Sequence, residues 1–249
     1  MEDLLNLNFS FNSIVHFQRV PPKYVAYKKE DLRKLLEIAK RHDNIYLEIL
    51  LCLFCGLRIG EVRGLNFDHV DFENHTITVM QQAPYESFIT IKTEHGVEKC
   101  LNEDCIKPPK SGSRTIKVPD IVVDELYRRR EKNKQYFKTH PNAVSYWRNY
   151  ICIGFGGELI SSKTVTEGLY KICKKNGLPK ISAHGLRHLC ATILLEQNVP
   201  LEEISHILGH ASVSTTFDIY CGEIQGRDNI LDFLSSNFDP ITHLARKAG

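Results

Sequence analysis

Hydrophobic residues recur along most of the chain at the spacing of amphipathic helices. Residues 28–42 show this spacing and carry acidic residues where the first helical turn would lie. Residues 43–55 are apolar on nearly every side, which is typical of a buried helix, and Gly56 is expected to end that helix. The same reasoning predicts further helices over residues 58–65, 120–137, 162–177, 201–210 and 228–238. Another helix, which holds His184 and Arg187, is predicted to begin after Ser182 as its N-cap.

Three segments are rich in β-branched and aromatic residues and are predicted to be strands: residues 75–81, 87–93 and 113–119. The segment between the second and the third, residues 94–112, is long for a simple turn and indicates an extra hairpin or loop. Residues 150–155 are expected to form a short buried strand. The pattern therefore predicts a mainly α chain with a small antiparallel β-sheet, an α+β fold.

With 249 residues and 42% hydrophobic content, the chain can build a substantial core in one or two domains. Its formal net charge of +2 does not by itself indicate nucleic-acid binding, because basic residues can gather locally. Six of them lie between residues 128 and 138, and four lie between residues 107 and 117. The first group is interpreted as the solvated face of a helix. The second group surrounds a lysine that is a candidate for chemistry.

The eight cysteines are expected to be free thiols. The N-terminus lacks the pattern of a signal peptide and no apolar run is long enough to span a bilayer, so a reducing, cytoplasmic location is expected. Cys52 and Cys55 form a C-x-x-C inside an apolar helix, which favours burial over redox chemistry. Cys100 and Cys105 have the spacing of half a zinc site, but no second ligand pair lies nearby and no metal site is expected.

A set of cationic and proton-transferring residues suits one chemical problem, the attack of a tyrosyl oxygen on a phosphodiester without a metal. Cations neutralise the transition state, and the planar guanidinium matches paired phosphate oxygens. A base and an acid move the protons, and the tyrosine forms the covalent intermediate. The candidates are Arg58, Lys110, His184, Arg187, His210 and Tyr220.

Three segments carry a family resemblance: GLRIGEVRGL, HGLRHLCATILL and ISHILGHASVSTTFDIY, in this order, with a lysine-bearing turn between the first two. Together they resemble the phage-integrase family of tyrosine recombinases, which includes Xer-type and conjugative-transposon integrases. The resemblance runs from about Lys28 to the C-terminus. It implies the tyrosine recombinase catalytic-domain fold, and site-specific DNA recombination in a phage or other mobile element. The reaction would proceed through a 3′-phosphotyrosyl intermediate, with no cofactor and no metal.

The two arginines and two of the histidines receive roles from this resemblance. Arg187 would clamp the non-bridging phosphate oxygens together with Arg58. Glu61 lies three residues after Arg58, one helical turn away, and is expected to pair with that arginine and orient it. His184 shares a helical face with Arg187 and would accept the tyrosine proton, while His210 would donate a hydrogen bond to the phosphate.

The remaining histidines near these motifs are interpreted as structural. His188 lies on a neighbouring helical face, because the pairing three positions apart is already used by His184 and Arg187. His206 shares a face with His210, four residues later, but the family motif does not demand a histidine there.

The resemblance makes Lys110 the general acid that protonates the departing 5′ oxygen. Lys92 is a competitor, because its surroundings, IKTEHG, also resemble the family's lysine-threonine turn, but only Lys110 is followed by a sequence, SGSRTIKVP, that matches the family's return strand. Tyr220, ten residues after His210, would be the nucleophile. Gly222 stands where the family often has a histidine, which leaves the local geometry around the nucleophile open.

The resemblance also implies a domain organisation and partners. Residues 1–25 are interpreted as a linker or N-terminal tail with the core-binding domain absent, and residues 26–249 as the catalytic domain with a C-terminal tail helix. The expected partners are double-stranded DNA, further copies of the chain in a tetramer on that DNA, and an accessory directionality factor, with no membrane. Two rival functions stay open: strand passage like that of a type IB topoisomerase, and DNA binding by a non-catalytic remnant of an integrase.

Overall fold

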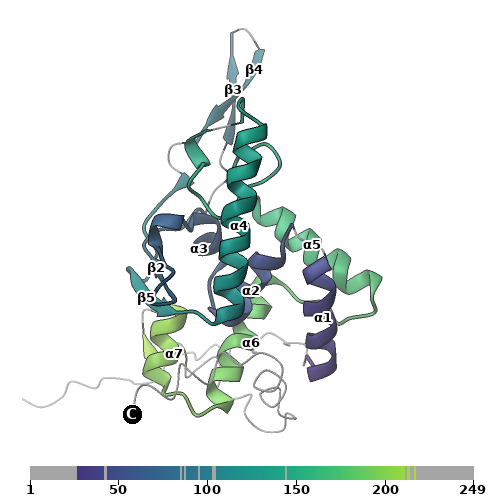
Figure 1. Cartoon of the computed structure of the whole chain (residues 1–249), viewed down its shortest axis with the longest axis vertical. Helices are drawn as coiled ribbons and strands as arrows, with labels where there is room; N and C mark the ends of the chain where they lie inside the picture. The colour runs from purple at the N-terminus through teal and green to yellow at the C-terminus, as the bar shows by residue number, and fades with distance from the viewer. Residues whose placement is uncertain are drawn as a thin grey trace, which may run out of the picture.

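The described part of the molecule is mainly helical, with a small sheet at one side (Figure 1). The computed structural model describes residues 27–41, 44–84, 86, 88–94, 96–102, 105–143, 145–210, 212, 213 and 216. Its helices are α1 (Lys29–Arg41), α2 (Tyr46–Phe54), α3 (Ile59–Gly64), α4 (Asp120–Thr139), α5 (Ser162–Lys175), α6 (Ala183–Glu196) and α7 (Leu201–Leu208), with short 3-10 helices η1 (Phe67–His69) and η3 (Ser145–Trp147). Its strands are β1 (Val70–Asp71), β2 (Thr76–Val79), β3 (Phe88–Thr93), β4 (Gly96–Leu101) and β5 (Arg114–Lys117).

Helix α2 forms the centre of the hydrophobic core. Every one of its residues is buried, as expected of a helix that is apolar on all sides, and α1, α3, α4 and α6 all pack against it. Cys52 and Cys55 are 0% and 1% exposed, and burial raises the pKa of both thiols. The C-x-x-C motif is therefore part of the core, as predicted, and its thiols are poorly suited to redox chemistry.

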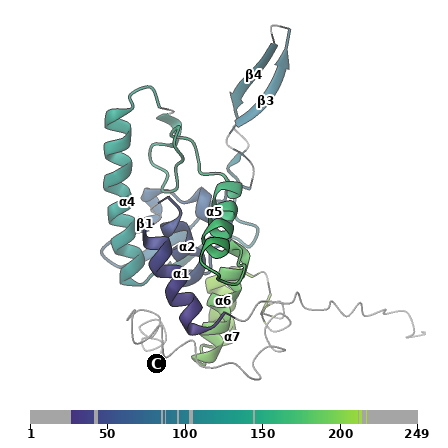
Figure 2. The same ribbon diagram turned by 90° about the vertical axis from the view of Figure 1, so that its right-hand side faces the viewer.

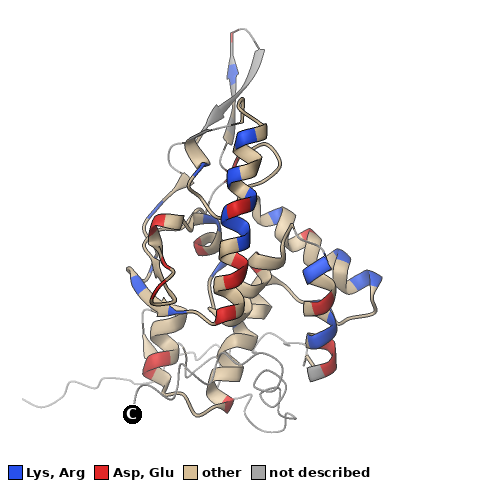
Figure 3. Cartoon of the chain, in the orientation of Figure 1, with Lys and Arg blue, Asp and Glu red and all other residues tan. Residues whose placement is uncertain are grey.

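One buried ion pair crosses this core. Glu48 of α2 is fully buried, and its carboxylate accepts hydrogen bonds from Arg129 of α4 at 2.8 and 3.2 Å. The basic run from residue 128 to residue 138 is consequently not a single solvated face, because helical geometry turns Arg129 inward. On the exposed side, Lys134 pairs with Glu131 at 2.7 Å. Acidic residues lie mainly in the first part of α4 and basic residues in the second (Figure 3).

The small sheet joins segments on either side of a long insertion. Its order is β1-β2-β5, all antiparallel, and Ile77 faces Ile116 across the β2–β5 pair. Strand β3, predicted at residues 87–93, pairs instead with β4 and forms a separate hairpin. This hairpin projects from the body at the end opposite α7 (Figures 1 and 2). The segment between the second and third predicted strands therefore does contain an extra hairpin strand.

The predicted fold class, mainly α with a small antiparallel sheet, is confirmed. The strand expected at residues 150–155 is wrong, because Tyr150 and Ile153 form only isolated bridges, to Asn66 and Leu159. The apolar residues between them are buried in the core without a neighbouring strand to extend the pairing. Among the described helices, none is both long and apolar enough to cross a membrane.

Replacing Arg129 tests the buried pair. Arg129→Met leaves the Glu48 carboxylate in the core without its cation, so the free energy of unfolding should fall by about 3–5 kcal/mol in a urea titration. Adding Glu48→Gln removes the uncompensated charge and should restore most of that loss. A single variant that loses less than ~1 kcal/mol, or a double variant with no recovery, would contradict this account.

Candidate functional site

Arg58 caps the start of α3 and faces the end of α7. The preceding Gly56 has a φ of +60°, which ends α2 and turns the chain. The backbone N–H of Arg58 donates to one oxygen of Glu61 at 3.0 Å, and its Nη1 donates to the other at 2.9 Å. The expected contact between Arg58 and Glu61 is therefore present. The Arg58 side chain stays 33% exposed, so it can still be reached from outside.

Glu61 is buried and holds a second arginine, Arg114 of β5. Arg114 donates to both carboxylate oxygens, at 3.2 and 2.7 Å, and both side chains are almost fully buried. Burial by itself raises the pKa of Glu61, but the hydrogen bonds and charge of Arg114, with those of Arg58, outweigh it and lower the pKa. Glu61 is thus an anion that joins the start of α3 to the start of β5.

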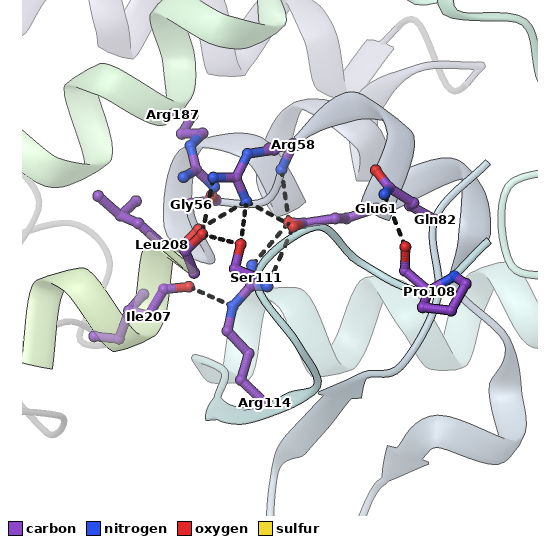
Figure 4. A network of polar contacts seen from close by, with 11 residues as sticks. Gly56, Arg58, Glu61, Gln82, Pro108, Ser111, Arg114, Arg187, Ile207 and Leu208 are labelled. Carbon is purple, nitrogen blue, oxygen red and sulfur yellow. Dashed lines mark hydrogen bonds and ion pairs between the residues drawn. The ribbon is translucent and has the colours of Figure 1, made fainter. Parts of the chain in front are cut away.

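The last carbonyls of α7 accept hydrogen bonds from the same two arginines (Figure 4). Arg114 Nε donates to Ile207 at 2.9 Å, and Arg58 donates to Leu208 at 3.3 Å and to Gly209 at 2.8 Å. Helix-terminal carbonyls have no partner within the helix and carry partial negative charge, so cations stabilise them. The carbonyl ends of α7 are therefore fixed just before His210.

The turn that carries Lys110 packs beside these groups. The Ser111 hydroxyl donates to the Gly209 carbonyl and lies 3.4 Å from Arg58 Nη1, while Lys110 itself is exposed. The competitor Lys92 lies on β3, opposite Val97, close to the tip of the projecting hairpin. The structure thus brings the Lys110 turn to Arg58 and leaves Lys92 on the hairpin.

Helix α6 brings His184 and Arg187 to the same place. Ser182 caps the helix as expected, because its hydroxyl accepts a hydrogen bond from the Gly185 N–H at 3.1 Å. Arg187 is 2% exposed and donates to the carbonyl of Gly56, in the turn just before Arg58. This contact joins the motif HGLRHLCATILL on α6 to the motif GLRIGEVRGL at the start of α3.

His188 is in direct contact with His184, which the sequence interpretation did not anticipate. Their Nε2 atoms lie 2.7 Å apart and the rings are nearly perpendicular, so one nitrogen donates and the other accepts. Burial, then the charge of Arg187 and of Arg58, lower the pKa of His184. Burial, followed by the neighbouring His184 and Arg187, lowers the pKa of His188 to about 3.

His210 follows the left-handed Gly209 and lies among cations. Its Nδ1 is 2.8 Å from the hydroxyl of Thr216, which is fully buried. Burial is the main cause that lowers the His210 pKa to about 4, and the charges of Arg187, Arg58 and Arg114 lower it further. Near neutral pH the imidazole is therefore uncharged, within a positive potential that suits an anionic phosphate. His206 is exposed on α7.

Tyr220 and Gly222 lie outside the described residues, as do residues 1–25 and the predicted tail helix at 228–238. Within the described part of the chain, Arg58, His184, Arg187, His210 and the Lys110 turn converge on one site. No group of three or more metal-ligand side chains gathers in that part, and Cys105 is buried beside Trp147.

Three residues of the site were not singled out from the sequence: Ser111, Arg114 and Thr216. Arg114 was counted within a basic cluster, and Thr216 lies inside the quoted TTFDIY segment. The signal for each was its place beside a motif residue, but the contact it makes depends on a segment distant in the sequence.

The chain is similar to one family of known proteins. The family model described as "Phage integrase family" matches residues 26–224. A "Tyrosine recombinase XerC-like" protein of Caldanaerobacter subterraneus subsp. tengcongensis is 28% identical over 226 residues, covering 89% of this chain and 56% of the relative. The transposase from transposon Tn916 of Enterococcus faecalis is 26% identical over 230 residues, covering 86% of this chain and 51% of the relative. The chain spans about half the length of these relatives.

Solved structures share the fold. The Tn1549 transposon integrase in complex with transposon right end DNA superposes with a TM-score of 0.61 at 21% identity, covering 91% of this chain and 66% of that one. The crystal structure of XerA recombinase gives 0.56 at 21% identity, covering 87% and 66%.

The depressed histidine pKa values predict acid sensitivity. Unfolded histidines take up protons near their usual pKa of 6.5, whereas folded His210 does so only near pH 4 and His188 near pH 3. The unfolded state therefore binds more protons below pH 6.5, and the free energy of unfolding should fall as pH drops from 7 to 5. The loss should be on the order of 1 kcal/mol for His210, after allowance for its partial exposure.

Urea titrations at pH 7, 6 and 5 measure this loss. His210→Gln and His188→Gln should each make the free energy of unfolding depend less on pH, because glutamine does not titrate. An unchanged slope in both variants would assign the acid sensitivity to other groups.

Proposed function

Because the chain belongs to the phage integrase family, we propose that it is the catalytic domain of a site-specific tyrosine recombinase. The Tyr220 oxygen attacks a DNA phosphodiester, a 3′-phosphotyrosyl bond forms, and the bond to the 5′ oxygen breaks. A 5′ hydroxyl from a partner strand then attacks the phosphotyrosine and releases Tyr220. The number and kind of bonds are conserved, so the exchange consumes no external energy source.

The observation that supports this proposal most directly is the convergence of Arg58, Arg187 and His210 around one positive site. The exposed side of Arg58 binds a non-bridging phosphate oxygen, and the buried Arg187 acts on the same phosphate through its charge. Their charges stabilise the extra negative charge of the transition state, and they do so without reorganisation because their other contacts already hold them.

We assign the two histidines the tautomers that suit their proposed roles. In His210, Nδ1 accepts from the Thr216 hydroxyl, 2.8 Å away, and Nε2 keeps the proton that is donated to the phosphate. In His184, Nε2 donates to His188, 2.7 Å away, and Nδ1 accepts the proton that Tyr220 loses. His188 therefore orients the base. Lys110 supplies the proton to the departing 5′ oxygen from a flexible stem at the edge of the site.

The proposed partners follow from this chemistry and from the relatives. Double-stranded DNA is the substrate, as solved structures of the Tn1549 integrase and of XerH recombinase are complexes with DNA. Strand exchange joins two duplexes and needs four cleavages, so four copies of the protein are expected to assemble on the DNA. An accessory directionality factor is proposed to select integration or excision. The protein would act in the cytoplasm, where that DNA is found.

Covalent trapping on DNA of randomised sequence tests the reaction and selects a cleavable site in the same step. The protein is incubated with a pool of nicked duplexes, in which the short cleaved strand diffuses away and prevents resealing. DNA that stays attached after denaturation is sequenced, and the selected duplex serves in later assays. Wild-type protein should yield such adducts and Tyr220→Phe should yield none, because one oxygen is lost with little change in volume.

Binding of the selected duplex by Tyr220→Phe is the control for folding and recognition, and it should be retained. Denaturation-resistant adducts with this variant would exclude Tyr220 as the nucleophile. Plain retention of DNA without any adduct by the wild type would indicate a binding module. Relaxation of supercoiled plasmid without strand exchange would indicate a topoisomerase.

The choice between the two lysines has its own test. Lys110→Ala should slow cleavage of an ordinary duplex by ~10²–10⁴-fold, the usual contribution of a general acid. A duplex with sulfur at the 5′ bridging position should restore cleavage, because a thiolate leaves without a proton. Lys92→Ala, the matched control on the β3–β4 hairpin, should cleave both duplexes at wild-type rates. Rescue of the Lys92 variant alone would show that the hairpin supplies the acid.

A further inference from the structure

Arg114 is the buried residue at which three separate segments of the site meet (Figure 4). Its side chain is 4% exposed, and its terminal nitrogens donate to both oxygens of Glu61, beside Arg58. Its Nε donates to the Ile207 carbonyl, near the end of the helix that precedes His210. Arg114 is also the first residue of β5, the strand that leads away from the Lys110 turn.

The Lys110 turn has no such anchor at the lysine itself. Lys110 is exposed, and its ammonium group has no partner among the residues that the structure describes. The turn is held from its C-terminal side, by the Ser111 hydroxyl on Gly209 and by the Arg114 side chain. Because the lysine stem is flexible, the position of this backbone decides which atoms the ammonium can reach.

We propose that Arg114 is a positioning residue for the acid of the reaction. By clamping the start of β5 to Glu61 and to the end of α7, it sets where the Lys110 ammonium stands relative to the phosphate on Arg58. The inference rests on the proposed function, in which Lys110 is the general acid. One carboxylate, Glu61, thus fixes Arg58, which binds the phosphate, and β5, the strand that follows the Lys110 turn, relative to each other.

The contacts require the shape of arginine. A planar guanidinium reaches two carboxylate oxygens and a carbonyl at once, whereas a lysine ammonium acts as a point charge and cannot reproduce the fork. Gly209 leaves the room for it, since a Cβ at that position would lie 2.5 Å from Arg114 Nη1. Gly209 also has a φ of +61°, which favours glycine.

The competing explanation is that Arg114 only stabilises the fold. The chain offers a matched control in Arg129, which is also 4% exposed and also forms a bidentate pair with a buried glutamate, Glu48. Arg129 lies in the core, so the loss of cleavage rate that destabilisation alone causes can be compared with the loss caused by a change at the Lys110 turn.

The experiment compares cleavage of the selected nicked duplex carrying oxygen or sulfur at the 5′ bridging position, in single turnovers with rates referred to folded protein. Arg114→Met should cleave the oxygen duplex ~10–100-fold more slowly than the wild type, the cost of misplacing a catalytic group by about 1 Å. The sulfur duplex should restore most of that rate, because its cleavage needs no acid. Arg114→Lys should behave in the same way. Arg129→Met should show the wild-type ratio of sulfur to oxygen rates.

Ser111→Ala provides a variant that keeps both buried pairs intact, so the test survives even if Arg114→Met does not fold. It removes the second anchor of the turn and should shift the sulfur-to-oxygen ratio in the same direction, by a smaller factor. A ratio that stays at the wild-type value in Arg114→Lys and Ser111→Ala would overturn the inference.

Lys110→Ala, measured in parallel, distinguishes a wrong assignment of Lys110 as the acid from a wrong positioning role for Arg114. If sulfur rescues Lys110→Ala but none of the Arg114 variants, Lys110 remains the acid and the positioning role of Arg114 is wrong. If sulfur rescues neither, the assignment of Lys110 as the acid fails, and the inference drawn from it fails too.

Discussion

The buried carboxylate of Glu61 is the interaction on which the rest of the site depends. Burying a carboxylate is costly, and here two guanidinium groups with well-aligned hydrogen bonds offset that cost. The same guanidinium groups of Arg58 and Arg114 extend to the carbonyl end of α7. The start of α3, the start of β5 and the end of α7 are consequently held together by one anion, and Arg58, the Lys110 turn and His210 lie on or next to these three segments.

The positive field of the site follows from this arrangement. Glu61 neutralises only part of the charge that Arg58, Arg114 and Arg187 bring together. Burial is the main cause of the low pKa of His210, and the excess positive charge is the second cause. Neutral imidazoles can donate or accept single protons, while the arginines carry the charge. An anionic phosphate bound there would offset the excess. The site is therefore preorganised for an anion by groups whose own hydrogen bonds do not need to change.

Short-range features of the site follow from the sequence. Arg58 and Glu61 are three residues apart, and their pairing across one helical turn was expected and is observed. His184 and Arg187 share a face of α6 behind the predicted Ser182 cap. Buried α2 and the mainly α class were also predictable, because periodicity and capping act within a few residues. The contact of His188 with His184 was not expected, although it acts at the same range, because rings one turn apart on α6 meet.

The family, the order of the motifs and the local helices that carry them can be read from the amino-acid sequence alone. Which buried charges meet depends on long-range packing. Arg114 pairs with a glutamate 53 residues away and with a carbonyl 93 residues away, and Arg129 pairs across 81 residues. Tertiary packing also makes β2 pair with β5 instead of β3, and it brings the turn that carries Lys110, through Ser111, to Arg58, while Lys92 stays on the β3–β4 hairpin. Composition shows that a charge is present, but its partner depends on which distant segments pack together and exclude water from between them.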